Sequence, residues 1–456
     1  ALEGRPMLNF KAFILPALFM PGLVHASTTT TAPALRVDSG DVAWVLMATV
    51  LVFLMCIPGL ALFYTGLVRL KNAIAMQMQV LVCFALVLLA WVVAGYALTF
   101  SDFLNFSEIG SKLLMLGVPV DTLFPVGEGR AIPTYLHVLV QGAFAAITCA
   151  IVLGAIAERA RFFGAMIFIL IWLFLAYVPI AHMVWHHSTA QDGLLAGWKV
   201  LDYAGGLVVH VNAGVAGLCA AYMIDKRAGF GRSPLAPHSL STVLTGTALL
   251  WIGWTGFNAG SALGANSLAA LAFMNTFVAS SAGCLVWVMV DKLRYGKSTA
   301  LGAASGALAG LVGITPAAGY VAPWAALVMG GLAAFFSFYA IGMVKRRWGI
   351  DDALDVFAIH GVSGLVGSLL VGVFAFTALG GNQSLPPDLG LTQALLGQVG
   401  VQALSTLVAM VVSALATFFA LFCADILTNL RLSDDEEAAG LDSVDHDETA
   451  YNFLNE

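Results

Sequence analysis

The strongest constraint on this chain is a succession of apolar runs of about 20 residues, each long enough to cross the hydrocarbon core of a membrane. Lipid offers the backbone no hydrogen-bond partners, so each run is expected to form a helix. Charged residues make up 10% of the chain, against about 25% in a soluble domain. An all-α polytopic membrane protein is therefore predicted. Its eleven transmembrane helices are placed at roughly 42–66, 73–100, 134–157, 162–182, 200–224, 239–262, 266–290, 299–315, 323–344, 353–378 and 393–427.

Basic residues set the predicted orientation, because loops rich in Lys and Arg stay on the cytoplasmic side. With the N-terminus outside, fourteen basic residues fall in cytoplasmic loops and four in external segments. The expected topology is therefore N-terminus outside and C-terminus cytoplasmic, in the cell inner (plasma) membrane.

The two ends of the chain differ in character from the membrane domain at 42–431. Residues 1–6 are interpreted as a cloning scar ahead of Met7, residues 7–26 as a signal peptide and residues 27–41 as an external leader. A retained extra helix is the alternative to a cleaved signal peptide. Residues 432–456 are acidic and polar and are predicted to form a cytoplasmic regulatory tail.

One pattern, D-x7-H-x3-G-x2-G, occurs twice inside apolar segments. A histidine within a membrane span is costly and therefore indicates function. The copies fall in the fifth and tenth predicted spans, which suggests a five-plus-five inverted repeat plus one C-terminal helix. If each Asp starts its helix, each His lies about 12 Å further on, near the bilayer midplane. The alternative is that each Asp is only a helix cap. The two copies are Asp202, His210, Gly214 and Gly217, and Asp352, His360, Gly364 and Gly367.

Other residues that often carry chemistry form no such pattern. The six cysteines lack CxxC spacing and are expected to be small buried hydrophobic residues. His186 and His187 lie in a polar segment, for which an exposed loop is favoured over a metal site. No metal, no cofactor, no catalytic residue and no nucleic-acid partner is predicted, and the protein is not expected to be an enzyme.

Several longer motifs stand in a fixed order along the chain, and together they resemble the ammonium transporter (Amt/Mep/Rh) family, most of all its bacterial members. The resemblance runs from about Asp41 to Asn452. The motifs are Ile57-Pro-Gly-Leu-Ala-Leu-Phe-Tyr64, Gly154-Ala-Ile-Ala-Glu-Arg159, Ala181-His-Met-Val-Trp185, Asp202-Tyr-Ala-Gly-Gly-Leu-Val-Val-His210, Gly253-Trp-Thr-Gly-Phe-Asn-Ala-Gly-Ser261 and Asp355-Val-Phe-Ala-Ile-His-Gly361.

The resemblance implies a homotrimer with one narrow pore in each subunit. It implies an external recruitment site for ammonium formed by Phe144, Trp185 and Ser261, where ring faces attract a cation and a hydroxyl accepts a hydrogen bond. It also implies an inner gate residue, Phe257, and a pore-lining Trp254. Val140 stands where many relatives have phenylalanine. We therefore expect an aliphatic outer partner in the gate, and no closure of this pore by two stacked rings.

The implied function is ammonium transport. Ammonium would lose a proton after recruitment, ammonia would cross an apolar pore, and His210 and His360 would relay the proton while Asp202 supports them. The tail resembles a segment that in bacterial members takes part in regulation by PII-type signal proteins, so a PII-type partner is expected. An ammonium sensor with little conduction is the alternative. A histidine-metal membrane enzyme is disfavoured, because no third ligand lies at metal spacing in either span.

Overall fold

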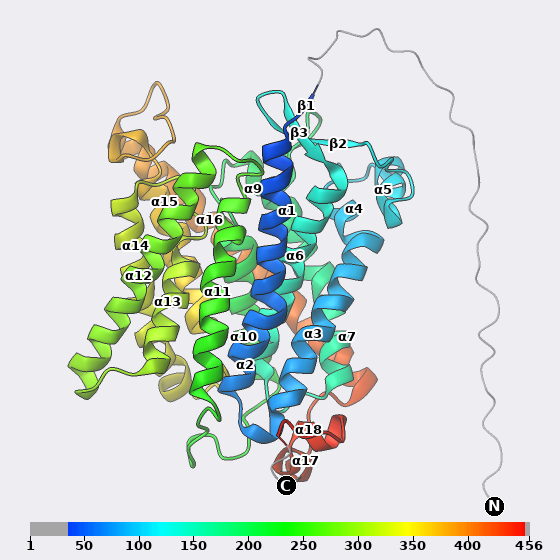
Figure 1. Ribbon diagram of the computed structural model, residues 1–456, viewed down its shortest axis with the longest axis vertical. Coiled ribbons are helices and arrows are strands. Elements are labelled where there is room, and N and C mark those ends of the chain that lie inside the picture. The colour runs from blue at the N-terminus through cyan, green and yellow to red at the C-terminus, as the bar shows by residue number, and fades with distance from the viewer. Residues whose placement is uncertain (1–34, 452–456) are drawn as a thin grey trace, which may run out of the picture.

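The computed structural model describes residues 35–451, which form a bundle of helices (Figure 1). The expected cloning scar, the expected signal peptide and residues 27–34 of the expected leader lie outside the described residues. The end of that leader lies within them. It forms strand β1 (Arg36–Val37), and the Asp38 side chain then accepts the Gly40 N–H and caps α1, which begins at Ser39, ahead of the predicted residue 42.

The first half of the bundle contains five spans, and each includes a short π-helical or 3-10 turn. The helices are α1 (Ser39–Leu54) with η1 (Met55–Leu60) and α2 (Ala61–Leu67); η2 (Leu70–Asn72) with α3 (Ala73–Ala90), η3 (Trp91–Gly95) and α4 (Tyr96–Thr99); α6 (Thr134–Leu153) with η5 (Gly154–Ile156); α7 (Phe162–Trp172) with η6 (Leu173–Tyr177) and α8 (Val178–Trp185); and η7 (Gly206–Val211) with α10 (Asn212–Met223).

The second half repeats this plan and adds one long helix. Its helices are α11 (Leu240–Gly260), α12 (Ser267–Tyr295), α13 (Ala300–Ile314), α14 (Pro323–Gly342) with η8 (Met343–Trp348), η9 (Phe357–Val362) with α15 (Ser363–Phe374), and α16 (Leu391–Thr428).

Short helices and strands lie at the two ends of the bundle. Above the bundle in Figure 1 lie a three-stranded sheet in the order β1-β3-β2 and the helix α5. The remaining bounds are α5 (Phe106–Lys112), η4 (Leu113–Met115), β2 (Leu123–Gly127), β3 (Arg130–Pro133), α9 (Leu194–Gly197), η10 (Thr377–Leu379), α17 (Asp434–Ala439) and α18 (Leu441–Asp445).

The number of full-length spans differs from the prediction by one. Within residues 35–451, ten helical segments are long and apolar enough to cross a membrane. The eighth predicted span is the 15-residue helix α13, which rises about 22 Å and is shorter than the hydrocarbon core of about 30 Å. Its small residues let it approach α12 closely, because a Cβ on Gly306 or Gly310 would meet the α12 backbone. The all-α polytopic membrane fold is otherwise as predicted.

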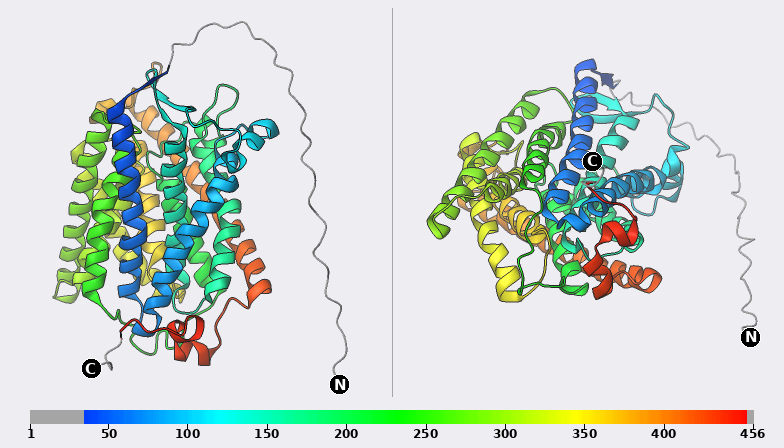
Figure 2. Two further views of the ribbon diagram at one scale, coloured as in Figure 1. Left: turned by 45° about the vertical axis from the view of Figure 1, so that its right-hand side comes forward. Right: turned by 60° about the horizontal axis from the view of Figure 1, so that its bottom comes forward.

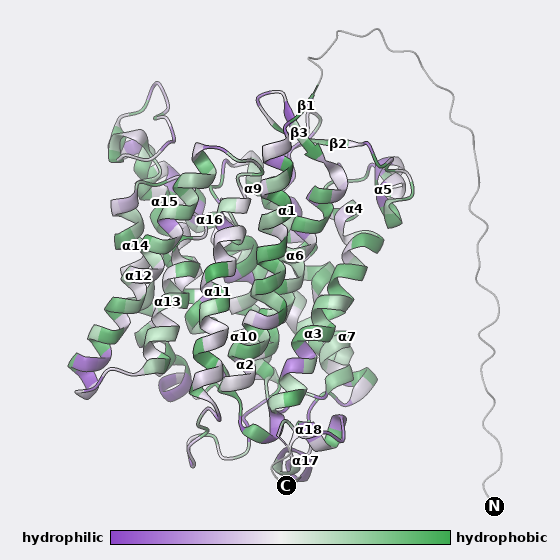
Figure 3. Ribbon diagram, in the orientation of Figure 1, coloured by the Kyte–Doolittle hydropathy of each residue, from purple (hydrophilic) through white to green (hydrophobic). Residues whose placement is uncertain are grey.

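Hydropathy is distributed as a membrane requires. Hydrophobic residues cover the middle of the bundle, and polar residues gather at its ends, most visibly on α17 and α18 (Figure 3). Leu89, Leu285 and Leu415 are each more than 60% exposed on the outer face. Such exposure is unfavourable in water and is neutral or better in lipid.

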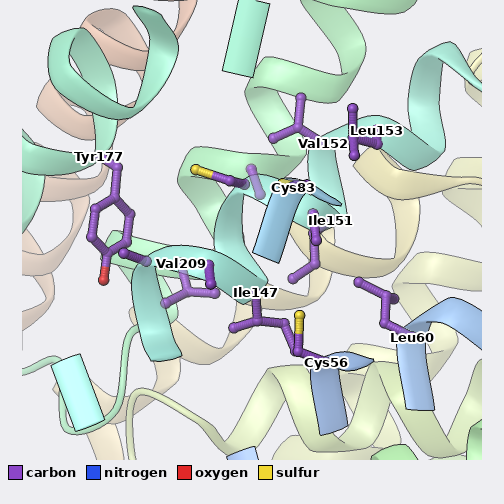
Figure 4. Packing of buried hydrophobic residues seen from close by; sticks show 14 of the residues in the cluster. Cys56, Leu60, Cys83, Ile147, Ile151, Val152, Leu153, Tyr177 and Val209 are labelled. Carbon is purple, nitrogen blue, oxygen red and sulfur yellow. The ribbon is translucent and has the colours of Figure 1, made fainter. Parts of the chain in front are cut away.

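The interior is apolar and closely packed. Side chains from η1, α3 and α6 meet there, including Leu60, Ile147 and Ile151 (Figure 4). Cys56 and Cys83 lie in the same cluster and are fully buried. The six cysteines are all unpaired, and the buried ones are small hydrophobic residues, as expected.

Contacts between the two halves are symmetric. Gly214, four residues after His210, lies against the backbone of Gly361, one residue after His360. In return, a Cβ on Gly364, four residues after His360, would lie 3.1 Å from Val211 N, one residue after His210. Matching residues exchange contacts in this way across a two-fold axis. The contact is the one expected of the predicted inverted repeat.

The backbone around the repeated motif shows the same symmetry. The residue after each Asp donates its N–H to the end of the third helix of the opposite half. Tyr203 N donates to Pro316 O at 3.1 Å, just beyond α13, and Ala353 N donates to Ala155 O at 3.2 Å, just beyond α6.

The tail closes the lower end of the bundle, where α17 and α18 lie across the ends of α2 and α3 (Figure 2, right). The Asp442 carboxylate accepts the N–H groups of Ile74 and Ala75 at 3.1 and 2.8 Å and so caps α3 from the far end of the sequence. Lys71 Nζ donates to Glu437 O at 2.6 Å. The described N- and C-terminal residues therefore lie at opposite ends of the molecule (Figure 1).

The close contact at Gly214 predicts that a methyl group added there destabilises the fold, whereas a methyl group added in open space does not. Gly214→Ala should lower the free energy of unfolding by about 1–3 kcal/mol, because its Cβ would overlap the Gly361 backbone. Gly397→Ala is the matched control, since a Cβ there meets nothing within 4 Å in helix α16. Thermal unfolding in detergent measures both variants. Equal midpoints for the two would show that the close contact does not stabilise the fold.

Candidate functional site

A cavity of about 610 Å³, which we name the upper vestibule, opens beside the three-stranded sheet. Phe144 and Trp185 meet edge to face on its wall, with ring centroids 5.9 Å apart and an interplanar angle of 83°. Trp185 ends α8, and its indole N–H donates to Asp202 O at 3.1 Å. Ser261 also lines this cavity and follows the C-terminus of α11. The structure thus brings together the three side chains predicted to recruit a cation.

One ring of the upper vestibule wall belongs to a stack of two phenyl rings. Phe144 from α6 and Phe257 from α11 lie face to face, with centroids 4.1 Å apart and an interplanar angle of 16°. The expectation that two rings could not close this pore is therefore wrong. Val140 lies one helical turn before Phe144 and lines the vestibule, so its replacement of phenylalanine does not affect the stack.

The two motif histidines meet beneath the rings. Their Nδ1 atoms lie 3.2 Å apart, so one Nδ1 carries a proton that the other accepts. His210 Nε2 is buried and has no hydrogen-bond partner among the described residues. An unpaired buried nitrogen is an available contact for a small polar molecule.

Trp254 and Phe257 hold His210 in place from α11. The Trp254 ring stacks on His210 at 5.2 Å and an angle of 20°. Its indole N–H donates to Thr315 Oγ1 at 2.9 Å, which fixes the plane of the stack. Trp254, which was predicted to line the pore, is therefore in direct contact with the histidine pair.

Below the histidines the space is narrow and apolar. A cavity of about 10 Å³ is lined by His360, Trp254 and Phe63, and this is about the volume that one water molecule needs. Phe63 also lines a second large cavity, of about 470 Å³, near the tail end. We name it the lower vestibule. Phe63 joins the narrow cavity to the lower vestibule, and Phe144 joins the upper vestibule through Phe257 to His210. The two vestibules, the stacked rings and the histidine pair therefore follow one another across the bundle.

Both motif aspartates act as caps, but the helices start later than expected. Asp202 accepts the N–H groups of Gly205 and Gly206 through Oδ1, and those of Leu207 and Val208 through Oδ2. Asp352 accepts the Phe357 N–H at 2.7 Å. The first helical residue is Gly206, so the chain from Asp202 to Gly205 is folded into a turn and the expected eight-residue helical rise of about 12 Å does not occur.

Each histidine lies in a π-helical turn, a feature that the sequence analysis missed. His210 belongs to η7 and His360 to η9. Such turns are rare and frequent at functional sites, because the wider turn redirects side chains and frees backbone groups. Gly205, with φ of +107°, precedes the first turn and offers the only sequence signal for the irregular start.

The segment after Trp185 is less exposed than expected. Both histidines line the upper vestibule, but His186 is 4% exposed, whereas His187 is exposed. His186 Nε2 lies 3.0 Å from Asp102 Oδ1, which the sequence analysis did not consider. Among residues 35–451, no group of three His, Cys, Asp or Glu side chains is arranged to hold a metal ion.

A buried charge cluster joins the helices at the tail end. Arg227 pairs with Glu158 at 2.9 Å and with Asp351 at 2.8 Å. Burial by itself raises the pKa of Glu158, but Arg227 and Arg69 outweigh it and hold that pKa below its usual range. Every charge of this cluster is paired, which is the usual condition for burying charges.

Comparison with known proteins agrees with this architecture. The Ammonium Transporter Family matches residues 43–451. The ammonium transporter of Aquifex aeolicus is 40% identical over 422 residues, covering 92% of this chain and 95% of that protein. The ammonium transporter of Bacillus subtilis is 39% identical over 412 residues, covering 90% and 98% of the two chains.

Solved structures show the same fold. Mep2 of Saccharomyces cerevisiae is 36% identical and superimposes with a TM-score of 0.76, covering 88% of both chains. A structure described as a sensor Amt protein is 27% identical and has a TM-score of 0.78, covering 88% of this chain and 97% of that one. Family match, sequence identity and fold agree over nearly the whole described chain: this multi-pass membrane protein belongs to the ammonium transporter family.

Proposed function

We propose that the protein moves ammonium through the pore described above, taking the ion at the upper vestibule and passing ammonia between the stacked rings. The observation that carries the proposal is the contact between His210 and His360 in an apolar passage with a vestibule at each end. The faces of Phe144 and Trp185 attract a cation. A bare ion in the narrow apolar space would lose its hydration without compensation, so loss of a proton above the rings is favoured, with His210 Nε2 as the buried base that receives it.

The histidine pair provides a route for the proton that ammonium loses. The two imidazoles share one proton through their Nδ1 atoms, and His210 Nε2 is available to a molecule entering from above. A proton added at one end of the pair displaces the shared proton towards the other. Ammonia and a proton that cross separately and recombine below give net transport of ammonium. The experiment that tests this function is the ammonium-evoked current in proteoliposomes at several pH values.

The two ends of the bundle fit the proposed orientation. The upper vestibule and the sheet lie outside, and the tail lies in the cytoplasm, where it binds α3 and the Arg161 side chain through Glu436 at 2.6 Å. Hydrogen bonds from Arg161 and Ser433 lower the pKa of Glu436 to about 2, so this contact persists at cytoplasmic pH. We propose that the protein is a homotrimer in the inner membrane and that the tail face receives a PII-type signal protein.

A second function, ammonium sensing with little conduction, is supported by the similarity to the sensor Amt protein. Both functions use the upper vestibule to bind ammonium, but only transport needs an open route past the histidines. Binding of ammonium to purified protein without a current in proteoliposomes would favour the sensor.

Replacing either pore histidine by alanine should abolish or uncouple the selective ammonium current, because the shared proton is lost. His238→Ala is the matched control, since the His238 side chain binds Val68 O and lines neither vestibule. Size-exclusion chromatography in detergent checks that the variants fold and assemble as the wild type does. Wild-type current and selectivity in both His210→Ala and His360→Ala would exclude the relay.

Trp185→Leu should weaken the apparent affinity for ammonium by about 2- to 5-fold, since a cation over an aromatic face contributes about 0.5–1 kcal/mol at an accessible site. The concentration giving half-maximal current is the measurement. Trp324→Leu removes a tryptophan that is 52% exposed on α14 and should have no effect. Equal effects of the two changes would place recruitment elsewhere.

Phe257→Leu removes one ring of the stack and should let the larger methylammonium compete better. The current ratio of methylammonium to ammonium should rise by on the order of tenfold, the effect that one methylene has in a close-fitting pocket.

Val140→Phe should be tolerated and should leave the maximal current unchanged or lower, since Val140 lies above the stack. A large increase in current with Val140→Phe contradicts this view of the gate.

A further inference from the structure

A carboxylate outside the predicted recruitment site is linked to the upper vestibule. Asp102 follows α4, and its Oδ1 accepts hydrogen bonds from His186 Nε2 at 3.0 Å and from Ser188 Oγ. The Asp102 side chain is 23% exposed, while that of His186 is 5% exposed. Because the His186 ring lines the vestibule next to Trp185, a solvent-accessible acid is joined through one imidazole to the cavity that receives the cation.

The other charges near this pair are matched by a partner of opposite sign. Glu108 and Lys112, both on α5 and both lining the vestibule, form an ion pair at 2.7 Å. In the loop after α8, Asp192 lies 3.8 Å from Lys199. Whenever His186 is neutral, the Asp102 carboxylate gives this wall of the upper vestibule a net negative charge.

The remaining histidines around the pair have other partners. His182 on α8 stacks on His186 at 4.7 Å and binds Thr99 O through Nδ1. His187 binds Asp192 at 3.3 Å. His137 on α6 binds the Tyr96 hydroxyl at 3.1 Å and lies under the Phe124 ring. His186 is therefore the histidine that contacts the unbalanced carboxylate.

Hydrogen bonds from Ser188 and His186 lower the pKa of Asp102, so the carboxylate remains charged as the solution becomes acidic. A proton taken up by His186 makes the pair neutral overall. The electrostatic attraction that a negative wall exerts on an approaching cation is then lost.

We propose that Asp102 attracts ammonium to the upper vestibule and that protonation of His186 cancels this attraction, so that pH changes the apparent affinity for ammonium. The proposal rests on the proposed function, because it takes ammonium as the transported ion. The maximal rate is set at the rings and the histidine pair and is not part of this effect. The attraction crosses partly solvated space and is therefore weakened by salt.

Initial rates of ammonium transport into proteoliposomes test the proposal, with equal pH on both sides and concentrations expressed as ammonium ion. Between about pH 8 and about pH 5, where histidine titrates, the wild-type KM should rise on the order of fivefold. His186→Gln retains a hydrogen-bond donor but cannot ionise, so its KM should stay low at every pH. Asp102→Asn should have a high KM at every pH.

His187→Gln is the matched control, since it makes the same change at the adjacent histidine and should follow the wild type. A wild-type KM that does not depend on pH, or a pH dependence retained in His186→Gln, overturns the proposal. So do variants that change only the maximal rate. If His186→Gln does not fold, Asp102→Asn must still raise KM at high pH. A wild type that transports no ammonium refutes the proposed function itself, before any variant is compared.

Discussion

The contact between His210 and His360 depends on how closely two interrupted helices approach each other. Each histidine lies in a π-helical turn, and each turn is followed by a glycine that packs on the backbone of the opposite half. A side chain at Gly214 would separate the two backbones and hence the two imidazoles. The pore centre is therefore built by backbone packing, and the histidines meet because the glycines carry no side chain.

This packing places two polar rings in surroundings that exclude water. The stacked Phe144 and Phe257 lie above the pair, and the narrow space beneath it has apolar walls. Moving a neutral molecule from water into this apolar space costs far less free energy than moving an ion there. The unpaired His210 Nε2 is the polar atom that the site offers to it. The proposed separation of the proton above the rings and its relay by the pair rest on this contrast between two open vestibules and an apolar centre.

Charge is confined to the two ends, and the two ends use it differently. At the tail end, Glu158, Arg227 and Asp351 neutralise one another and join segments that are far apart in sequence. Asp442 adds the tail to the same end by capping α3. At the upper vestibule the Asp102 carboxylate accepts hydrogen bonds from an imidazole and a hydroxyl. One end is therefore suited to rigid assembly, and the other to a charge that varies with pH.

The membrane fold, the inverted repeat and the meeting of His210 with His360 could be predicted from the amino-acid sequence, because apolar runs and a repeated motif are local patterns whose spacing survives folding. The family resemblance pointed to Phe144, Trp185, Ser261, Phe257 and Trp254, which lie near one another in the structure and whose roles are proposed. Which ring stacks on which could not be predicted in this way. Val140 and Phe144 are one turn apart on the same helix, and the position of α11 selects Phe144 as the partner of Phe257. Contacts between distant segments likewise set the π-helical turns, the short α13 and the link from Asp102 to His186. Residue spacing along one segment does not encode such contacts.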